Sequence, residues 1–157
     1  MKEELSHINE KGEVVMVDVS HKDTTKRQAT ASGCVSFPEE VFRELTTSGF
    51  ISKKGGIIQT AVIAGIQAVK QTHTLIPLCH QLLLDKVHID IVPDTSALCI
   101  TCTVGSTGRT GVEMEALTGV SVAALTVYDM CKALSHDITI TEIQLERKQG
   151  GKKDFTR

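Results

Sequence analysis

The apolar residues of the chain follow two different periods, and these periods predict which segments are strands and which are helices. Alternation at every second residue predicts strands over 14–20, 28–36, 86–92 and 97–104, and a final strand over 138–147. The segment 86–104 is predicted to be a hairpin, because the Pro-Asp-Thr-Ser sequence between its two strands is typical of a turn. In the final strand the alternation shifts between Ile140 and Ile143, which predicts a β-bulge.

Three other segments show the helical period. A helix is predicted over 38–47, with Ser36 as its N-cap and Gly49 just past its end. A second helix is predicted to begin near residues 53–56 and to continue to about Thr72, and a third covers 112–134. Small residues on the second helix predict close packing on a sheet or on another helix: Ala64, Gly65 and Ala68. Helices mixed with hairpins predict an α+β fold, a ferredoxin-like antiparallel sheet with helices packed on one face.

Composition bounds the class of protein. The chain has 157 residues, so we expect a single domain over 1–157, with flexible arms at about 1–13 and 150–157. Aromatic residues make up 3% and the net charge is −2, which argues against a nucleic-acid partner. Five cysteines, with no apolar leader and no apolar run of membrane-spanning length, predict a cytoplasmic protein that does not enter a membrane.

Asp129 and Lys132 are the first candidates for chemistry. They are three residues apart on the third predicted helix, so they lie on one face. A carboxylate beside an ammonium can serve as a base and acid pair, since each group tunes the pKa of the other. A surface ion pair is the plainer alternative. The nearly uncharged sequence around the pair favours the functional interpretation.

Glu113 and Glu115 are predicted to lie at the start of the same helix. The helix dipole favours carboxylates there, which accounts for them without a ligand. Fourteen residues separate Glu115 from Asp129, about 21 Å along a straight helix. One small ligand cannot easily reach both within one subunit. The glutamates are therefore structural, or two subunits share each site, which is the hypothesis we prefer.

The remaining candidates are histidine, cysteine and basic residues. His80 follows an apolar run, where it is either a hydrogen-bonded core residue or a residue of a cleft. Cys99 and Cys102 form a C-x-x-C, but on a strand their side chains point to opposite faces, so packing is favoured over metal binding. Glycines flank lysines at residues 53–56 and 148–153, an arrangement that can cradle phosphate.

Several segments, in order along nearly the whole chain, resemble the cyclic pyranopterin monophosphate synthases, the protein C family of molybdenum cofactor biosynthesis. The matching segments are 16–20 with Lys22, Thr25 and Arg27, then 54–55, 63–66, 75–80, 110–118, 121–126, 128–133 and 150–152. The resemblance implies a lyase that converts (8S)-3′,8-cyclo-7,8-dihydroguanosine 5′-triphosphate to cyclic pyranopterin monophosphate and releases diphosphate. It also implies a ferredoxin-like subunit in a homo-hexamer, a trimer of dimers with sites at the dimer interface.

The resemblance also implies roles for particular residues. It places Asp129 and Lys132 at the catalytic centre as base and acid, and it makes Lys54 essential for the rearrangement. The substrate-binding positions that it implies are His80, Glu113, Met114, Glu115, Lys148, Leu78 and Cys79, with Asp18, Lys22 and Arg27 on the N-terminal segment. Mg²⁺ is a possible partner of the triphosphate, although the sequence shows no ligand cage for it.

This chain departs from the family pattern at several positions. Gln81 stands where proline usually follows the histidine, Gly56 replaces an acidic or amide residue, and Val62 replaces a frequent arginine. Lys153-Asp154 follows the last glycine pair in place of Ser-Gly. The alternative function is a non-catalytic, oligomeric, ferredoxin-like module that binds a small anion, and a metal-dependent hydrolase is a third, disfavoured possibility.

Overall fold

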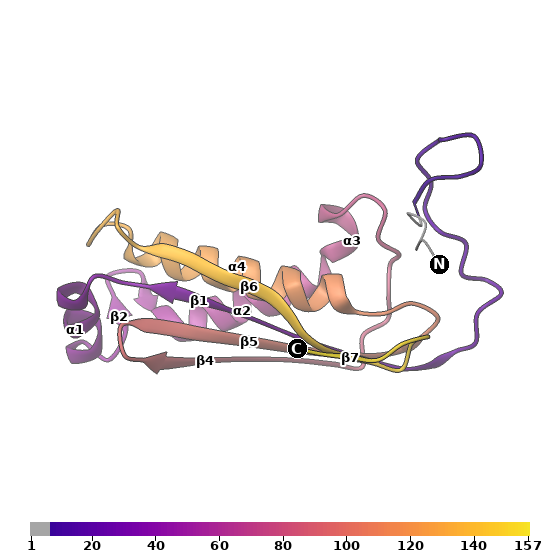
Figure 1. Ribbon diagram of the computed structural model, residues 1–157. Helices are drawn as coiled ribbons and strands as arrows, with labels where there is room; N and C mark the ends of the chain where they lie inside the picture. Colours follow the sequence, from indigo (N-terminus) through magenta and orange to yellow (C-terminus); the bar gives the residue numbers. More distant parts are fainter. Residues whose placement is uncertain (1–6) are drawn as a thin grey trace.

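A five-stranded antiparallel sheet is the framework of the molecule. In the computed structural model, which describes residues 7–157, its strand order is β4-β5-β1-β6-β7 (Figure 1). The strands are β1 (Thr25–Ser36), β4 (Lys86–Asp94), β5 (Ala97–Gly108), β6 (Thr139–Gln149) and β7 (Phe155–Thr156). A separate hairpin pairs β2 (Ile51–Ser52) with β3 (Gly55–Gly56).

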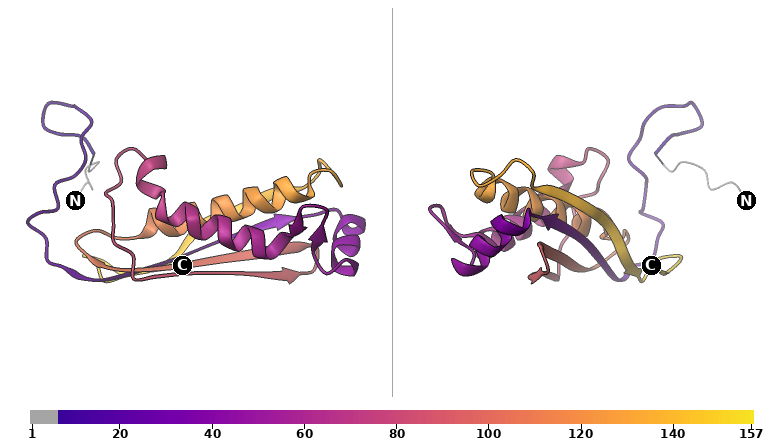
Figure 2. Two further views of the ribbon diagram at one scale, coloured as in Figure 1. Left: turned by 180° about the vertical axis from the view of Figure 1, so that it is seen from behind. Right: turned by 60° about the vertical axis from the view of Figure 1, so that its left-hand side comes forward.

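The two long helices cover one face of this sheet. They are α2 (Ile57–Lys70) and α4 (Glu113–Cys131), and they lie side by side along the strands (Figure 2). The short helix α1 (Glu39–Thr47) stands at one end of the sheet, and α3 (Thr72–Leu75) follows α2 near the other end. The predicted α+β fold, a ferredoxin-like sheet with helices on one face, is confirmed.

Small residues bring α4 close to the central strand. Every second residue of β1 faces the helices, and these residues are small at its centre: Ala29, Ala31 and Gly33 are fully buried. A Cβ atom at Gly33 would lie 2.8 Å from Cγ1 of Val120 in α4, so no larger residue fits there. The sheet and helix layers therefore enclose a core of Val, Ile, Leu and Ala.

The two long helices also meet closely, so of the two predicted partners of the small residues in α2, a sheet or another helix, the contact at Gly65 is with a helix. A Cβ atom at Gly65 of α2 would lie 2.9 Å from the backbone oxygen of Gly119 and 3.2 Å from Cβ of Ala123, both in α4. The backbones can approach only because position 65 has no side chain. This contact fixes the position of α4, and therefore of both of its ends.

The hairpin and the bulge of the predicted strands are confirmed. β4 pairs with β5 from Lys86 opposite Gly105 to Asp94 opposite Ala97. The register between β1 and β6 shifts between Ser32 and Cys34, opposite the segment 141–144, and Glu142 there has a φ of 56°. A second shift occurs between Thr30 and Ala31.

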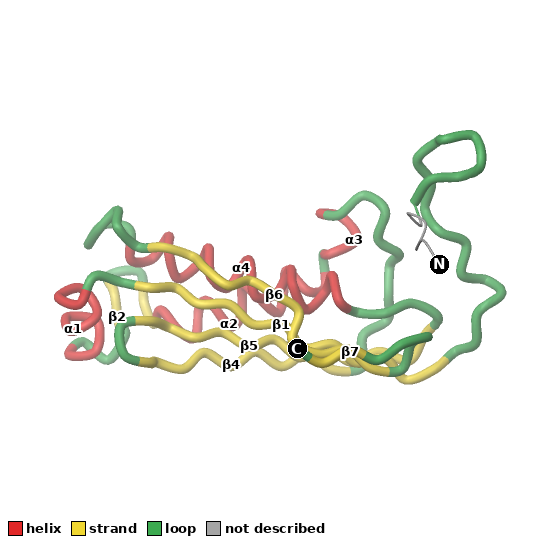
Figure 3. Tube along the Cα trace, viewed as in Figure 1, coloured by secondary structure: helices red, strands yellow, loops and turns green. Residues whose placement is uncertain are grey.

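The predicted strand over 14–20 is wrong. Apart from one bridge between Ile8 and Val14, this segment forms no strand, and Figure 3 draws it as a loop. Its valines are half-buried at every second position, at Val15, Val17 and Val19, because one side of the extended segment faces the rest of the molecule. β1 in turn begins at Thr25, three residues before the predicted start.

Two helix boundaries also differ from the prediction. Residues 51–56 form the β2–β3 hairpin, with Gly55 at a φ of 110°, so α2 begins only at Ile57, and the separate α3 follows it. Ser36 does not cap α1. The N-cap position is occupied by Pro38, and no side-chain hydrogen bond caps this end of the helix. Gly49, at a φ of 66°, follows the end of that helix as predicted.

The chain ends differ in how they are held. After Gln149 the tail turns, with the Gly150 N–H donating to Oδ1 of Asp154 at 3.1 Å, and β7 then pairs with Arg147 and Lys148. This pairing holds Lys148 beside the start of α4. Of the arm predicted over 1–13, residues 1–6 lie outside the described residues, and residues 7–13 form a turn.

Candidate active site

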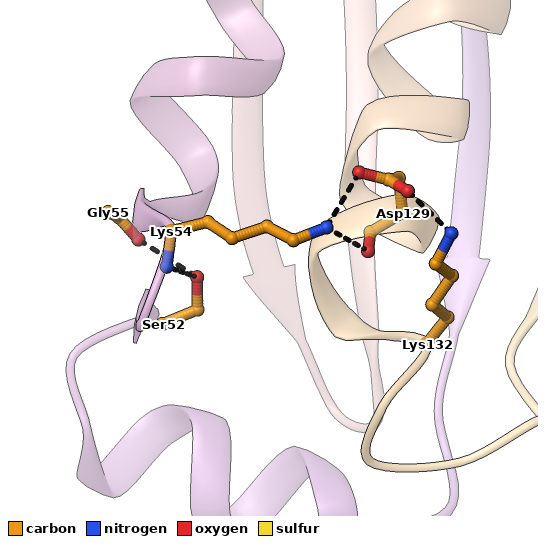
Figure 4. A network of polar contacts seen from close by, with 5 residues as sticks. All are labelled: Ser52, Lys54, Gly55, Asp129 and Lys132. Carbon is orange, nitrogen blue, oxygen red and sulfur yellow. Dashed lines mark hydrogen bonds and ion pairs between the residues drawn. The ribbon is translucent and has the colours of Figure 1, made fainter.

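Three charged side chains meet where α4 ends (Figure 4). Nζ of Lys132 lies 2.8 Å from Oδ1 of Asp129, and Nζ of Lys54 lies 3.0 Å from Oδ2 of the same carboxylate. Lys54 also donates to the backbone oxygen of Asp129 at 3.3 Å. The tight β2–β3 turn presents Lys54, whose backbone N–H donates to Oγ of Ser52 at 3.1 Å. We refer to these three residues as the charged cluster.

The lysines set the ionisation of the charged cluster. Hydrogen bonds from Lys132 and then Lys54 lower the pKa of Asp129, and Asp129 in turn raises the pKa of Lys132. The side chains of Asp129 and Lys132 are about half exposed, at 55% and 53%, so water still screens their attraction. At neutral pH the carboxylate is ionised and the cluster carries one net positive charge.

A second group of side chains lines a cavity of about 250 Å³ at the other end of α4. Nε2 of His80 lies 2.8 Å from the backbone oxygen of Val17, so the N-terminal segment is tied over this cavity. Glu115 is buried here, and burial raises its pKa. Burial also raises the pKa of the Cys79 thiol. The sequence-predicted residues that line this cavity are Lys22, Leu78, Cys79, His80, Glu113, Met114 and Glu115.

A neighbouring cavity of about 270 Å³ is strongly cationic. Its lysines and arginines come from the N-terminal segment, β1, the loop before α4, β6 and the tail: Lys22, Arg27, Arg109, Lys148, Lys152 and Lys153. Glu113 offsets one of these charges, since Oε1 of Glu113 lies 3.1 Å from Nζ of Lys148. The two cavities share Lys22, Thr110, Gly111 and Glu113, and we call them together the α4 N-terminal site.

The structure therefore separates the predicted site residues into two groups. Asp129, Lys132 and Lys54 meet at one end of α4, and the substrate-binding candidates meet at its other end. Asp18 lines neither cavity of the α4 N-terminal site; its Oδ1 accepts the Ser20 N–H at 2.8 Å, and this bond lowers its pKa. The N-cap of α4 is Val112, whose side chain makes no capping bond, and Glu113 and Glu115 follow in the first turn.

The sequence prediction missed some residues of the cationic cavity. Arg109 and Gln28 line it, and neither was a candidate. Arg109 directly precedes the longest matching segment, so its position was a usable signal. Gln28 was part of a predicted strand and carried no charge, and only the fold places it beside the tail.

An apolar cavity of about 500 Å³ adjoins the charged cluster. Lys54 lines it together with Leu45, Ile51, Met130 and Leu134. Ile51 and Leu134 are exposed, at 64% and 42% of their surface. Open apolar surface of this kind beside the half-exposed charged cluster is typical of a contact between subunits.

The residues present show no ready-made metal centre. Within residues 7–157, no three side chains of His, Cys, Asp or Glu come close enough to hold a metal ion. None of the helices in this part of the chain is both long and apolar enough to cross a membrane.

Comparison with known proteins shows which family the sequence matches. The sequence model of the MoaC family matches residues 16–151. A protein of Xanthomonas campestris is 55% identical over 152 residues, covering 96% of this chain and 92% of the relative. Proteins of Sulfurovum and Helicobacter hepaticus are 50% and 46% identical, each over 98% of both chains. All three relatives are named cyclic pyranopterin monophosphate synthase.

Proposed function

This chain belongs to the MoaC family, and from that premise we infer that it is a cyclic pyranopterin monophosphate synthase, a lyase of molybdenum cofactor biosynthesis. The reaction converts (8S)-3′,8-cyclo-7,8-dihydroguanosine 5′-triphosphate to cyclic pyranopterin monophosphate and diphosphate. A hydroxyl of the substrate forms the new bond to the α-phosphorus, the α–β phosphoanhydride bond breaks, and the hydroxyl proton leaves to a base.

One observation supports this chemistry most directly: a single carboxylate is held between two ammonium groups. Lys54 and Lys132 lie 3.0 and 2.8 Å from the two oxygens of Asp129. Rearranging the purine rings requires several proton transfers, which a carboxylate and an ammonium in contact can supply as base and acid. We propose that Asp129 and Lys132 have these roles and that Lys54 orients the carboxylate.

The ionisation of the cluster supports a role for a second subunit at this site. Its lysines lower the pKa of Asp129, which weakens this carboxylate as a base. Removing water would disfavour the charged form of each side chain. The pKa of Asp129 would then rise and that of Lys132 would fall, so both pKa values would move closer to pH 7. A second subunit placed over the charged cluster and its apolar cavity would remove that water.

The separation along α4 supports the same arrangement. About 21 Å of helix lies between Glu115 and Asp129, more than one small substrate can bridge. We propose that the α4 N-terminal site of one subunit and the charged cluster of a second copy form each reaction site. Such shared sites accord with a homo-hexamer built as a trimer of dimers.

The α4 N-terminal site suits the two halves of the substrate. We propose that its cationic cavity binds the triphosphate, with Lys22, Arg27 and Lys148 among the ligands, because clustered cations stabilise the departing diphosphate. The other cavity, with Glu113, Glu115 and His80, suits the N–H groups of the guanine-derived ring. We propose that any Mg²⁺ enters with the triphosphate and takes phosphate oxygens among its ligands.

The deciding experiment measures diphosphate and pyranopterin formation from the cyclised dihydro-GTP. We expect Lys132→Ala to lower the rate by about 10²-fold or more, the usual contribution of an acid–base group. Lys70→Ala is the matched control, because Lys70 is exposed at the end of α2 and lines none of the three cavities described above, and we expect it to retain the wild-type rate. Equal rates for wild type and Lys132→Ala would refute the proposed role.

The alternative of a non-catalytic anion-binding module gives a different result in the same assay. It would bind triphosphate in the cationic cavity but form no product.

A cytoplasmic location remains part of the proposal, supported by the odd number of five cysteines.

A further inference from the structure

Two thiols face each other on the uncovered side of the sheet, whereas the charged cluster belongs to the helix layer on the other side. Cys34 of β1 is directly opposite Cys99 of β5 in the strand register. Their Sγ atoms are 3.4 Å apart. Both residues are half-buried, since no helix covers this face within the described part of the chain.

This arrangement meets the backbone requirement for a disulfide. Residues directly opposite in an antiparallel pair have Cα atoms about 4.5 to 5.5 Å apart. Disulfides span Cα separations of about 4.4 to 6.8 Å, so β1 and β5 need not move apart or together. The Sγ atoms must approach by little more than about 1 Å, which side-chain rotation can provide.

The other three cysteines lack such a partner. Cys102 belongs to the C-x-x-C with Cys99 but lies on the opposite, helix-covered face, where burial raises its pKa to about 12. Cys131 is buried in α4, and burial raises its pKa to about 11. Cys79 lies in the α4 N-terminal site. The pair formed by the fold therefore differs from the pair suggested by the spacing in sequence.

We propose that Cys34 and Cys99 are a redox-responsive dithiol, which a peroxide oxidises to an intramolecular disulfide that joins β1 to β5. One thiolate attacks the O–O bond of hydrogen peroxide and becomes a sulfenic acid, releasing hydroxide. The second thiol then attacks that sulfur, the S–S bond forms, and water leaves. Two thiols and one peroxide thus give one disulfide and two waters.

The surroundings of the pair favour the second step over the first. Burial, and then the hydrogen bond with Cys99, raise the pKa of Cys34 to about 11, so its thiolate fraction at neutral pH is small and the attack on peroxide is slow. Once a sulfenic acid forms, its partner sulfur already lies within contact distance. The structure therefore predicts disulfide formation without accumulation of sulfinic acid.

The test treats the full chain with excess hydrogen peroxide, blocks remaining thiols with iodoacetamide, and maps the peptides by mass spectrometry. We expect a Cys34–Cys99 linked peptide that dithiothreitol removes. The variants Cys34→Ser and Cys99→Ser should lose it, and Cys79→Ser should retain it. Sulfinic acid at Cys34 without the linked peptide, or a linkage through Cys79, would overturn the proposal.

Thermal unfolding provides a second measurement. The disulfide would close a long loop between strands of the core sheet, so oxidised wild type should melt about 5 °C or more above reduced wild type. The variant Cys34→Ser, which leaves the register of β1 intact, should melt at one temperature with or without peroxide. An unchanged melting temperature in a sample shown to be fully cross-linked would contradict the predicted tie between the strands.

Discussion

At the scale of single residues, the chemistry depends on how neighbours alter each carboxyl group. Asp129 is half exposed and its pKa is lowered by two lysines, whereas Glu115 is buried and its pKa is raised. The two ends of α4 therefore hold carboxyl groups with opposite tendencies to bind a proton. Such divergence is typical of sites that need both an acid and a base.

Glu115 gives a prediction about stability and pH. Because its pKa is raised in the fold, the folded chain binds more protons than the unfolded chain. Its contribution to stability is therefore present below the unfolded pKa and is lost as the pH rises through the folded pKa. We expect Glu115→Gln to raise the melting temperature relative to wild type at pH 8, and the difference to vanish near about pH 4.

The matched control is Glu40→Gln, at an exposed position in the first turn of α1. Melting temperatures measured from pH 4 to pH 8 should show a growing difference for Glu115→Gln and a much smaller one for the control. A Glu115→Gln variant that is less stable than wild type at pH 8 would show that the buried carboxylate is stabilised in the fold.

Sequence spacing predicted some contacts of the site and not others. The pairing of Asp129 with Lys132 followed from their separation on one helix. Lys54 is 75 residues away in the chain from Asp129, so only the family resemblance, and not spacing, pointed to it. Pairing of β7 with β6 places the tail lysines beside Arg109, and long-range pairing of this kind leaves no local signal.

At the scale of elements, long hydrophobic patterns predicted the strands and helices of the core correctly. The β4–β5 hairpin, the bulge in β6 and the long α4 were all predicted, since their alternation or stripe extends over many residues. The segment 14–20 misled the prediction because Val17 and Val19 face a cavity and not a neighbouring strand. The β2–β3 hairpin was missed because two-residue strands are too short to show a period.

The contact between α2 and α4 gives a prediction at this scale. Gly65→Ala would place a Cβ atom 2.9 Å from the backbone oxygen of Gly119, an overlap that costs about 1 to 3 kcal/mol. Alanine gains up to about 1 kcal/mol over glycine in a helix, which offsets only part of this cost. We expect a net loss of up to about 2 kcal/mol in urea unfolding.

Gln67→Ala is the control for this experiment, because Gln67 is exposed in the same helix. It should stay within about 0.5 kcal/mol of wild type. If Gly65→Ala proved more stable than wild type, helix propensity and not close packing would govern this position.

At the scale of the whole molecule, the distance between the ends of α4 makes a prediction about assembly. Lys132→Ala damages the charged cluster, and His80→Ala damages the α4 N-terminal site. If two subunits share each site, a mixed dimer of these inactive variants contains one intact site and one doubly altered site. Random mixing should then restore about a quarter of the wild-type activity.

The mixed sample should be prepared by unfolding and refolding the two variants together, with each variant refolded alone as the control. Activity in the mixture and none in the controls would support the shared site. No recovery in a mixture that mass spectrometry shows to contain hetero-oligomers would contradict it, and each chain would then have to contain a whole site.

The tie between His80 and the N-terminal segment has a consequence for hydrogen placement. A carbonyl oxygen can only accept, so Nε2 of His80 must carry the hydrogen that Val17 receives at 2.8 Å. The uncharged imidazole is thereby restricted to one tautomer, with the lone pair at Nδ1. Proteolytic cleavage before Val17 would keep the carbonyl acceptor and therefore this tautomer. Cleavage after Val17 would remove the acceptor, and the hydrogen could then lie on either ring nitrogen.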